Sequence, residues 1–418
     1  MKQGYLSDYF DAVGRKTLRL VDTLVGSNQH EVGDSDKDEA LKAVLGKVAR
    51  KRPNQFDALY VRLLSDEDSI RCSGKLSWYD TRAKKRDRSA EWRLYYQTNP
   101  VTELMAEGDT LFVARQPDDK VLFIVVPKES SLLTQLSWLF GLTQPLESEI
   151  FSIRQIHQSS ENDQLNFLSR FILEELGIEF EDPESSRIDS IVEPFGLKLP
   201  KTKEFSALAR ETLPEVDART DPDEALIAWI DHEERMFRRL EKRIVANRLV
   251  QGFLNDDEEP DVDAFIKFSL SVQNTRKSRM GLSFEHHVGA LLNSHNIRYA
   301  TQAITERRNK PDFLFPGQAE YDSAEFRTDL LTLLAAKSTC KERWRQISSE
   351  ADRIERKHLI TTEPGVSEAQ TTQMDAQHVQ LVVPRSIHQT YNLAQQDWLW
   401  SVSDFIELVR TRQQQAET

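Results

Sequence analysis

The sequence predicts two folds in succession, a mainly β domain followed by an α/β domain with a mixed sheet flanked by helices. Between about residues 56 and 138 the chain carries five short runs rich in aromatic and β-branched residues, separated by polar turns. Such runs are typical of strands, and this many in so short a segment indicate a barrel or pseudobarrel. From about residue 200 long helical patterns begin, and after residue 300 strands and helices alternate. That alternation predicts a central mixed sheet covered by helices.

The expected elements follow from these patterns. The first fifty residues are predicted to be helical, because residues 36–51 carry apolar positions at helical spacing. Strands are expected at 56–64, 75–80, 91–97, 110–116 and 121–127, and later at 300–305, 311–316, 331–337, 358–362 and 379–384. Helices are expected at 221–253, 261–273, 283–295, 341–357, 367–376 and 401–412. We expect a first domain at 1–145, a connector at 146–200 and a second domain at 201–418.

Composition narrows the class of protein. A chain of 418 residues with 39% hydrophobic and 29% charged residues is typical of a globular protein with more than one core. The longest apolar run, Val121 to Val126, is too short to cross a membrane, and the N-terminus lacks the apolar core of a secretory signal. Two cysteines are too few for a disulfide framework. We therefore expect a cytoplasmic protein.

The net charge of −13 argues against a protein that binds nucleic acid over its whole surface. The charges are, however, unevenly distributed. Between Lys75 and Arg93 seven basic side chains occur with three acidic ones, whereas acids cluster at 34–39, 175–184 and 256–263. This separation suits a protein that holds DNA locally and repels it elsewhere.

Two carboxylates and a lysine at strand ends carry the most specific chemistry. Asp312 follows Pro311 at the start of one predicted strand, and Lys337 ends the next. Mg²⁺ prefers carboxylate oxygens and keeps several waters, so one or two carboxylates suffice to hold it. A lysine beside them can contact a phosphate and orient the attacking water. A Pro-Asp pair followed by a strand-terminal lysine is the pattern of the PD-(D/E)xK nucleases.

The usual form of that pattern has an acid two residues before the lysine, where this chain has Ala335. Glu350, thirteen residues after the lysine on the expected helix, is the predicted replacement, so that Asp312 and Glu350 would hold the metal. Glu285 is a candidate fourth member of the site. Each residue alone has an ordinary explanation, as a turn, a strand end or a solvated helix face. Their order and spacing together favour the catalytic interpretation.

The sequence around these residues resembles the catalytic domain of the EcoRII-type restriction endonucleases. The segments TRKSRMGLSFEHHV, YATQAITERRNKPDFLFP and LLAAKSTCKERWRQISSEADRI carry the resemblance, which begins near Asp221 and runs almost to the end. It implies Asp312, Lys337 and Glu350 as the active site, Glu285 as an additional acid, and Mg²⁺ as cofactor. It also implies a CC(A/T)GG target.

In that family a basic-acidic-basic triplet after the catalytic lysine reads bases, and here the triplet is Lys341, Glu342 and Arg343. A basic side chain can donate to guanine, and a carboxylate can accept from cytosine N4. An exposed helical turn is the ordinary alternative. Arg276, Lys277 and Arg279 form a second predicted DNA-contacting cluster, in which phosphate contact is as plausible as base contact.

The N-terminal part, about residues 55–140, is similar to the B3-like DNA-binding pseudobarrel of BfiI-type enzymes. The resemblance implies DNA contacts by basic and aromatic residues on strands and loops. The candidates are Lys75, Trp78, Arg82, Lys84, Lys85, Arg86, Arg88 and Arg93. For Trp78, Trp92 and Tyr95, a place in the barrel core is the stronger interpretation.

Two DNA-binding modules suggest an effector arrangement like that of type IIE enzymes, in which two copies of the target site are bound. The functional partner would be a cognate cytosine methyltransferase, without physical contact, and the protein could be a monomer or a homodimer. Two other functions stay open at this point. One is a non-cleaving DNA-binding regulator, and the other is an endonuclease directed at methylated DNA.

Overall fold

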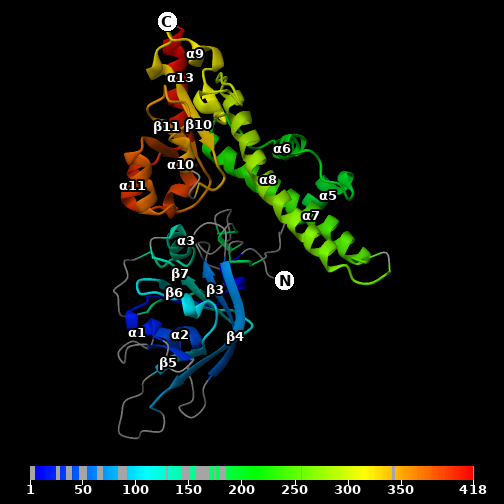
Figure 1. Ribbon diagram of the computed structural model, residues 1–418, viewed down its shortest axis with the longest axis vertical. Coiled ribbons are helices and arrows are strands. Elements are labelled where there is room, and N and C mark those ends of the chain that lie inside the picture. The colour runs from blue at the N-terminus through cyan, green and yellow to red at the C-terminus, as the bar shows by residue number, and fades with distance from the viewer. Residues whose placement is uncertain are drawn as a thin grey trace. The chain divides into compact units, whose positions relative to one another are not determined.

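The computed structural model describes residues 5–24, 29–33, 40–46, 54–63, 69–82, 92–128, 130–143, 151–156, 169–170, 172–173, 176–178, 185–255, 257–340 and 344–417. The chain divides into two compact units. The first comprises Met1–Pro183 with Pro364–Ser367, and the second comprises Glu184–Glu363 with Glu368–Thr418. Figure 1 shows a unit rich in strands and a unit rich in helices.

The first unit is built on one eight-stranded sheet. Its strands are β1 (Ala12–Thr17), β2 (Gln29–Gly33), β3 (Asn54–Leu63), β4 (Ser69–Asp80), β5 (Trp92–Gln97), β6 (Thr110–Arg115), β7 (Val121–Val126) and β8 (Ser152–Gln155). They lie in the order β2-β5-β4-β3-β7-β6-β1-β8, and all neighbours are antiparallel except β3 and β7. The helical segments are η1 (Leu6–Asp8), α1 (Leu20–Thr23), α2 (Ala40–Leu45), η2 (Thr102–Leu104) and α3 (Ser131–Leu139).

Alternation along the strands produces two apolar faces. One cluster contains Leu76, Trp78 and Phe123, and another contains Phe112 and Phe140. Because side chains alternate across a strand, β6 and β7, which are buried almost throughout, supply both clusters. The five strands expected between residues 56 and 127 are therefore confirmed as strands. The B3-like pseudobarrel stays a prediction.

The expectation that the first fifty residues are helical is wrong. Residues 12–17 form β1, which pairs with β6 and β8, and the helix around residue 40 is only six residues long. The segment Ala12–Lys16 is buried throughout, so tertiary packing on both faces decides its conformation.

The second unit has a four-stranded mixed sheet in the order β12-β11-β10-β9. The strands are β9 (Phe313–Phe315), β10 (Thr332–Ala336), β11 (Lys357–Ile360) and β12 (Val379–Val382). Strands β10, β11 and β12 are parallel, and β9 is antiparallel to β10. Every residue of these strands is buried, as expected for a sheet covered on both faces. The mixed α/β sheet predicted for this part of the chain is confirmed.

The helices of this unit pack partly against the sheet and partly against one another (Figure 1). They are α5 (Ser185–Val192), α6 (Thr202–Glu211), α7 (Pro222–Gln251), α8 (Val262–Ser294), α9 (Gln318–Asp322), α10 (Trp344–Ile347), α11 (Glu368–Ala376), α12 (Leu393–Trp398) and α13 (Val402–Ala416), with short 3-10 segments η4 (Glu193–Phe195), η5 (Glu306–Arg308), η6 (Thr328–Leu330) and η8 (Arg385–Thr390). Helix α7 begins as predicted, with the Asp221 side chain accepting the Glu224 N–H and Pro222 in the first turn.

Three expectations for this unit need correction. The two helices predicted at 261–273 and 283–295 are one continuous helix, α8, because the polar stretch between them contains no proline and Gly281 is tolerated within it. Residues 300–305 form no strand, apart from a single bridge between Ala300 and Leu314. The helix predicted at 341–357 is described only at Trp344–Ile347 and is followed by turns.

Within the described parts of the chain, no helix is both long enough and apolar enough to cross a membrane.

Candidate active site

The antiparallel pairing of β9 with β10 brings Asp312 and Lys337 together. Because the two strands run in opposite directions, the residue before β9 lies beside the end of β10, where Phe313 pairs with Leu334. Asp312 Oδ2 accepts a hydrogen bond from the backbone N–H of Ala336 at 2.8 Å and one from Lys337 Nζ at 2.7 Å. The Lys337 backbone N–H in turn donates to the Ile360 carbonyl at 3.0 Å. Both side chains are thus fixed at one edge of the sheet and still reach solvent, at 13% and 26% exposure.

Glu350 lies in the turn after α10, and not on a helix as predicted. The turn is held from several sides. Lys357 Nζ donates to the Ser348 carbonyl at 2.8 Å, and Asn309 donates to the Ser349 carbonyl at 2.9 Å. Glu306 accepts the backbone N–H of the turn at residue 352, at 3.1 Å. These contacts join the turn to the segment just before Asp312.

The backbone around this turn is strained. Ala351, the residue after Glu350, has φ +49°, and Arg307 and Arg308 have φ +58° and +61°. Side-chain-bearing residues rarely adopt this left-handed region, and such strain persists only where the surrounding structure imposes it. Ala351 is fully buried, so its neighbours fix the reversal of the chain that places Glu350.

The pKa shifts show that the acids share one electrostatic environment. Burial raises the pKa of Glu350, and repulsion from the Asp312 carboxylate raises it further, while Lys337 and Lys357 oppose the effect. Burial and repulsion from Asp312 also raise the pKa of Glu285, against the attraction of Lys337. Both glutamates therefore lie near enough to Asp312 to interact with its charge. The structure brings Asp312, Lys337, Glu350 and Glu285 into one region, the acid-lysine region.

The donor set of this region fits a hard divalent cation. The region contains three carboxylates and one lysine, so negative charge is in excess, and a cation there would relieve the repulsion that adds to the effect of burial on the two pKa values. No group of three or more His, Cys, Asp or Glu side chains among the described residues is arranged to hold an ion by itself. Mg²⁺ requires fewer protein ligands, because it keeps several of its waters.

The predicted DNA-contacting residues of this unit fall into two groups. Lys341, Glu342 and Arg343 lie outside the described residues. Arg276 donates from Nε to both carboxylate oxygens of Glu241, at 2.9 and 2.8 Å.

Arg279 donates to the Pro200 carbonyl at 2.6 Å, and its guanidinium lies 5.3 Å from the rings of Phe205 and Phe237. Lys277 is exposed. Arg276 and Arg279 thus contact the helical layer, and DNA contact by the three residues stays a prediction.

In the first unit, the predicted DNA-contacting residues differ in exposure, because side chains alternate between the two faces of a strand. Trp78 is fully buried and stacked on Trp92, with ring centroids 5.6 Å apart, so its proposed contact with DNA is wrong and its place in the core is confirmed. Lys75 is exposed and forms an ion pair with Asp57. Arg82 and Arg93 are partly exposed. Lys84, Lys85, Arg86 and Arg88 lie outside the described residues.

Two tyrosines beside Arg93 were not predicted as surface residues. Tyr79 pairs with Arg93 and Ser77 pairs with Tyr95 across β4 and β5. The rings of Tyr79 and Tyr95 lie 6.0 Å apart, and both are partly exposed. Interpreting Tyr95 as core was wrong. The period of two along a strand could have revealed this, because Trp78 and Tyr96 are buried and their neighbours must point the other way.

A second charged cluster lies on the other side of α8. His287 is fully buried and donates from Nε2 to Glu233 Oε2 at 2.8 Å, while Arg210 donates to His287 Nδ1 at 3.1 Å. Burial lowers the pKa of His287. Burial alone would raise the pKa of Glu233, but hydrogen bonds from His287, Ser206 and Ser283 and the attraction of His287 lower it. The cluster thus contains a carboxylate, an imidazole and an arginine, and each has a partner.

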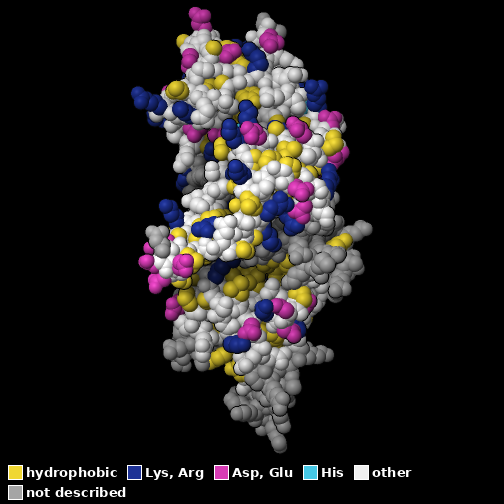
Figure 2. Space-filling model, turned by 90° about the vertical axis from the view of Figure 1, so that its right-hand side faces the viewer, with side chains coloured by type: hydrophobic (Ala, Val, Ile, Leu, Met, Phe, Trp, Pro, Cys, Tyr) yellow, Lys and Arg dark blue, Asp and Glu magenta, His cyan; other side chains and the backbone are white. Residues whose placement is uncertain are grey.

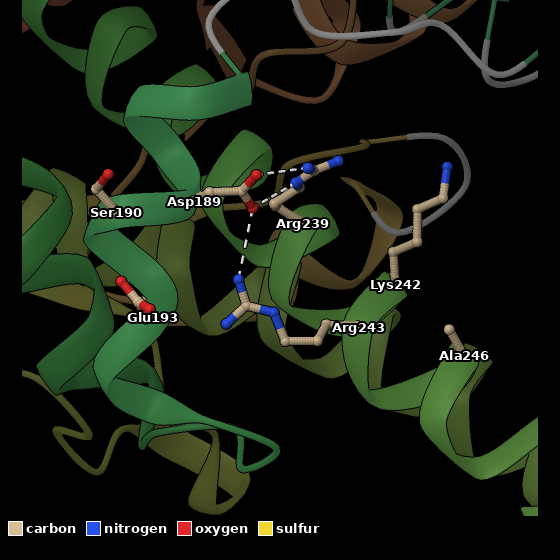
Figure 3. A pocket seen from close by; sticks show the side chains of 7 residues that line it. All are labelled: Asp189, Ser190, Glu193, Arg239, Lys242, Arg243 and Ala246. Carbon is tan, nitrogen blue, oxygen red and sulfur yellow. Dashed lines mark hydrogen bonds and ion pairs between the residues drawn. The ribbon is translucent and has the colours of Figure 1, made fainter. Parts of the chain in front are cut away.

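A surface pocket of about 530 Å³ lies between α5 and α7 (Figure 3). Asp189 forms ion pairs there with Arg239 and Arg243. Arg239 donates from Nε to Asp189 Oδ1 at 2.6 Å. The pocket shares no residue with the acid-lysine region, and two of its three basic side chains, Arg239 and Arg243, already have a carboxylate partner.

The comparison with protein families matches the part of the chain that carries the acid-lysine region. The model of the family described as EcoRII C terminal matches residues 237–406. The type II restriction enzyme EcoRII of Escherichia coli is 44% identical over 187 residues, which are 44% of this chain and 45% of that enzyme. The matched stretch thus spans less than half of that relative.

Two solved structures are also similar. One is the restriction endonuclease PspGI in complex with substrate DNA, at 17% identity, covering 52% of this chain and 94% of that one with a TM-score of 0.42. The other is metal-depleted Ecl18kI in complex with uncleaved DNA, at 18% identity, covering 55% and 85% with a TM-score of 0.43.

Proposed function

Because residues 237–406 belong to the EcoRII C-terminal family of domains, we propose that this chain is a type II restriction endonuclease that makes sequence-specific double-strand cuts in DNA. The observation that carries the proposal is the contact of Lys337 with Asp312 at the edge of the β9–β10 pair, with Glu350 and Glu285 within reach of the same charge. The family match supplies the reaction class, and the site supplies groups that can perform it.

The residues of the site have distinct roles in this proposal. Asp312 and Glu350 hold the cation, and Glu285 adds negative charge beside them. Lys337 contacts the scissile phosphate and orients the attacking water, from a position fixed by its own backbone bond to β11. The held turn after α10 keeps Glu350 directed at the site without reorganisation during the reaction.

The cation we propose is Mg²⁺. When bound, it neutralises charge on the phosphate and increases the acidity of coordinated water. The oxygen-only donor set and the small number of carboxylates favour Mg²⁺ over softer metals. This choice rests on the chemistry of the ligands.

For the target we propose CC(A/T)GG, read in part by Lys341, Glu342 and Arg343. Support comes from the sequence similarity to EcoRII and from the position of the triplet directly after Cys340, only a few residues from Lys337. For the first unit we propose a B3-like effector domain that binds a second copy of the target. The partly exposed group of Tyr79, Arg93 and Tyr95 supports a DNA-binding face there.

The decisive experiment compares the full-length protein with Asp312→Asn and Lys337→Ala. With Mg²⁺, the wild-type protein is expected to cut DNA containing CC(A/T)GG, and EDTA is expected to stop it. Each variant should lose at least about 10³-fold in cleavage rate, because each removes a group acting directly at the phosphate. Specific binding, measured by gel shift in Ca²⁺, should stay within a few fold. Lys310→Ala is the matched control, because it removes a nearby lysine that the site does not use.

The outcomes separate the proposed function from its alternatives. Cleavage that persists in both variants would contradict the site assignment. Specific binding by the wild-type protein without any cleavage would indicate a DNA-binding regulator. Cleavage only of cytosine-methylated substrate would indicate a methylation-directed enzyme. Sequencing of the product ends gives the target and the cut position together.

A further inference from the structure

The Glu306 carboxylate joins three segments of the second unit. Its Oε2 atom accepts the hydroxyl of Tyr321, on α9, at 2.5 Å, and the backbone N–H of Asp352, in the turn after Glu350, at 3.1 Å. Glu306 itself opens η5, which ends four residues before Asp312. One oxygen atom thus links α9, the segment that leads to Asp312 and the turn that carries Glu350.

This carboxylate differs from the surface ion pairs of the chain. Figure 2 shows basic and acidic side chains interspersed over one face of the molecule, and exposed pairs of that kind contribute little to stability. Glu306 instead accepts from a backbone N–H and from the hydroxyl of Tyr321, a residue that is only 4% exposed. Burial alone would raise the pKa of Glu306, but the bonds from Tyr321 and backbone N–H groups and the charge of Arg353 lower it. The carboxylate is therefore ionised at neutral pH, and hydrogen bonds to an ionised acceptor are the stronger kind.

Arg353 fixes the tyrosine from the other side of the turn. Its guanidinium lies 5.5 Å from the centre of the Tyr321 ring, and it donates to the Tyr321 carbonyl and, at 3.1 Å, to the Phe326 carbonyl. Because Arg353 directly follows Asp352, whose N–H Glu306 accepts, the chain after Glu350 is held at two consecutive residues. Rotation of the Glu306 side chain would break both of its bonds.

The position of these bonds explains how Glu306 can act on Glu350. The peptide that Glu306 holds follows Ala351, whose φ of +49° is one that side-chain-bearing residues rarely adopt. Such a conformation persists only where surrounding contacts impose it. Without the bond at Asp352, Ala351 can return to an ordinary conformation, and the preceding residue, Glu350, would then change direction. Besides burial, the charges that shift the pKa of Glu350 are those of Asp312, Lys337 and Lys357. Glu306 therefore acts through the backbone.

We propose that Glu306, held in place by Tyr321, is a positioning residue that sets the affinity of the acid-lysine region for its divalent cation. This inference rests on the proposed function, because Glu350 acts there as a cation ligand. A site with only one or two carboxylate ligands depends strongly on their direction, since Mg²⁺ demands near-ideal octahedral geometry. In metal sites, loss of a residue that orients a ligand typically lowers metal affinity or activity by about 10- to 100-fold.

The test measures cation affinity directly, by calorimetric titration of Ca²⁺ into the full-length protein bound to a DNA duplex that contains CC(A/T)GG. Ca²⁺ takes oxygen ligands as Mg²⁺ does, and it serves here as a non-cleaving substitute. Glu306→Ala should raise the dissociation constant of Ca²⁺ by about 10- to 100-fold. Tyr321→Phe removes only the hydroxyl and leaves the ring against Arg353, so it should raise this constant by about 3- to 10-fold. Glu306→Gln, whose amide oxygen can still accept both bonds, should recover part of the affinity.

Cleavage as a function of Mg²⁺ concentration gives the second readout. The half-saturating Mg²⁺ concentration should rise in step with the dissociation constant of Ca²⁺, while the rate at saturating Mg²⁺ stays within a few fold of the wild-type rate. Tyr299→Phe is the matched control, because it removes a tyrosine hydroxyl bond, to the Gly289 carbonyl at 3.3 Å, that does not reach the turn. This control should keep the wild-type affinity for Ca²⁺.

Wild-type affinity for Ca²⁺ in both Glu306→Ala and Tyr321→Phe would overturn the inference and leave the proposed function intact. So would an equal loss of affinity in Tyr299→Phe, since the cause would then be general destabilisation. If Glu306→Ala does not fold, Tyr321→Phe decides alone, because it keeps the packing of the ring. A wild-type complex that binds Ca²⁺ but does not cut with Mg²⁺ would instead contradict the proposed function, and the Ca²⁺ titration would still decide whether Glu306 positions the site. A wild-type complex that binds no Ca²⁺ would overturn both.

Discussion

Helix α8 carries two charged clusters that are built in opposite ways. On one side, His287 joins Glu233 and Arg210, and hydrogen bonds from several donors lower the pKa of the carboxylate. On the other side, Glu285 lies near Asp312, and the pKa of Glu285 is raised. The first cluster contains enough partners to compensate its buried charge. The second cluster lacks enough such partners, although its side chains are less deeply buried.

The comparison distinguishes charged groups that stabilise the fold from charged groups that can bind a ligand. A cluster whose members satisfy each other contributes to packing and has no capacity left for a ligand. A cluster with three carboxylates and one lysine is electrostatically destabilised, and such a site gains most from binding a cation and a phosphate. The comparison therefore supports the acid-lysine region as the reactive site without reference to any relative.

After Asp312→Asn and Lys337→Ala, the largest effect is expected from Glu350→Gln. In the proposed mechanism this change removes a cation ligand, so the cleavage rate should fall by on the order of 10²–10³-fold. The same change removes repulsion from Asp312, so the metal-free protein should unfold at a higher temperature. Rates from plasmid cleavage and midpoints from calorimetry provide the two readouts. Glu355→Gln, at an exposed position on the same segment, should change neither. Equal losses of activity and stability would mean that Glu350 is structural.

Much of this site was predictable because strands are encoded locally. The apolar runs before Lys337 and after Asp312 predicted β9 and β10, and their antiparallel pairing places the two residues in contact. Glu350 was predicted from its position after Lys337 and then from the resemblance, but on a helix that ends before it. Its turn depends on contacts with residues forty or more positions away, which no local pattern reveals.

Other features could not be predicted because they depend on tertiary packing. The Glu233–His287 bond joins two helices over 54 residues of sequence, so neither residue is conspicuous in the chain. Residues 12–17 form a strand because they pair with β6 on one side and β8 on the other. The α8 helix was divided in the prediction because its middle is polar.

The cluster of Glu233, His287 and Arg210 should, in contrast, lose stability when Glu233 is changed to Ala. The change leaves His287 and Arg210 in the helical layer without their carboxylate, which typically costs about 3–5 kcal/mol of stability. Urea unfolding followed by circular dichroism measures the loss. Glu234→Ala, which breaks the partly exposed pair with Arg238, should cost no more than about 1 kcal/mol. If both variants lose the same stability, Glu233 does not act as a buried partner.

A buried histidine on β11 provides a further test of how burial affects an ionisable group. His358 lies between the rings of Trp400 and Phe405, at 5.4 and 5.1 Å, and burial lowers its pKa from 6.5 to about 3. The folded protein keeps this ring neutral while the unfolded chain takes up a proton below pH 6.5. Stability is therefore lost as the pH falls from about 6.5 towards 3, by about 2 kcal/mol at pH 5. His358→Leu should reduce this loss, as measured by urea unfolding at pH 7 and pH 5. An unchanged difference between the two pH values would show that His358 is not responsible.

The smallest effect is expected for Glu285→Gln, which acts where the two clusters meet on α8. The raised pKa of Glu285 means that its ionised form is less stable in the folded protein than in the unfolded chain. Its contribution therefore weakens the fold as the pH rises above the ordinary range of a glutamate, and the glutamine should raise stability at pH 7.5 by on the order of 0.5 kcal/mol. At pH 4 the gain should largely disappear, because the native carboxyl is then protonated. Calorimetry at the two pH values measures the difference. A gain that is equal at both pH values would assign the effect to packing, and the electrostatic contrast between the two sides of α8 would then fail.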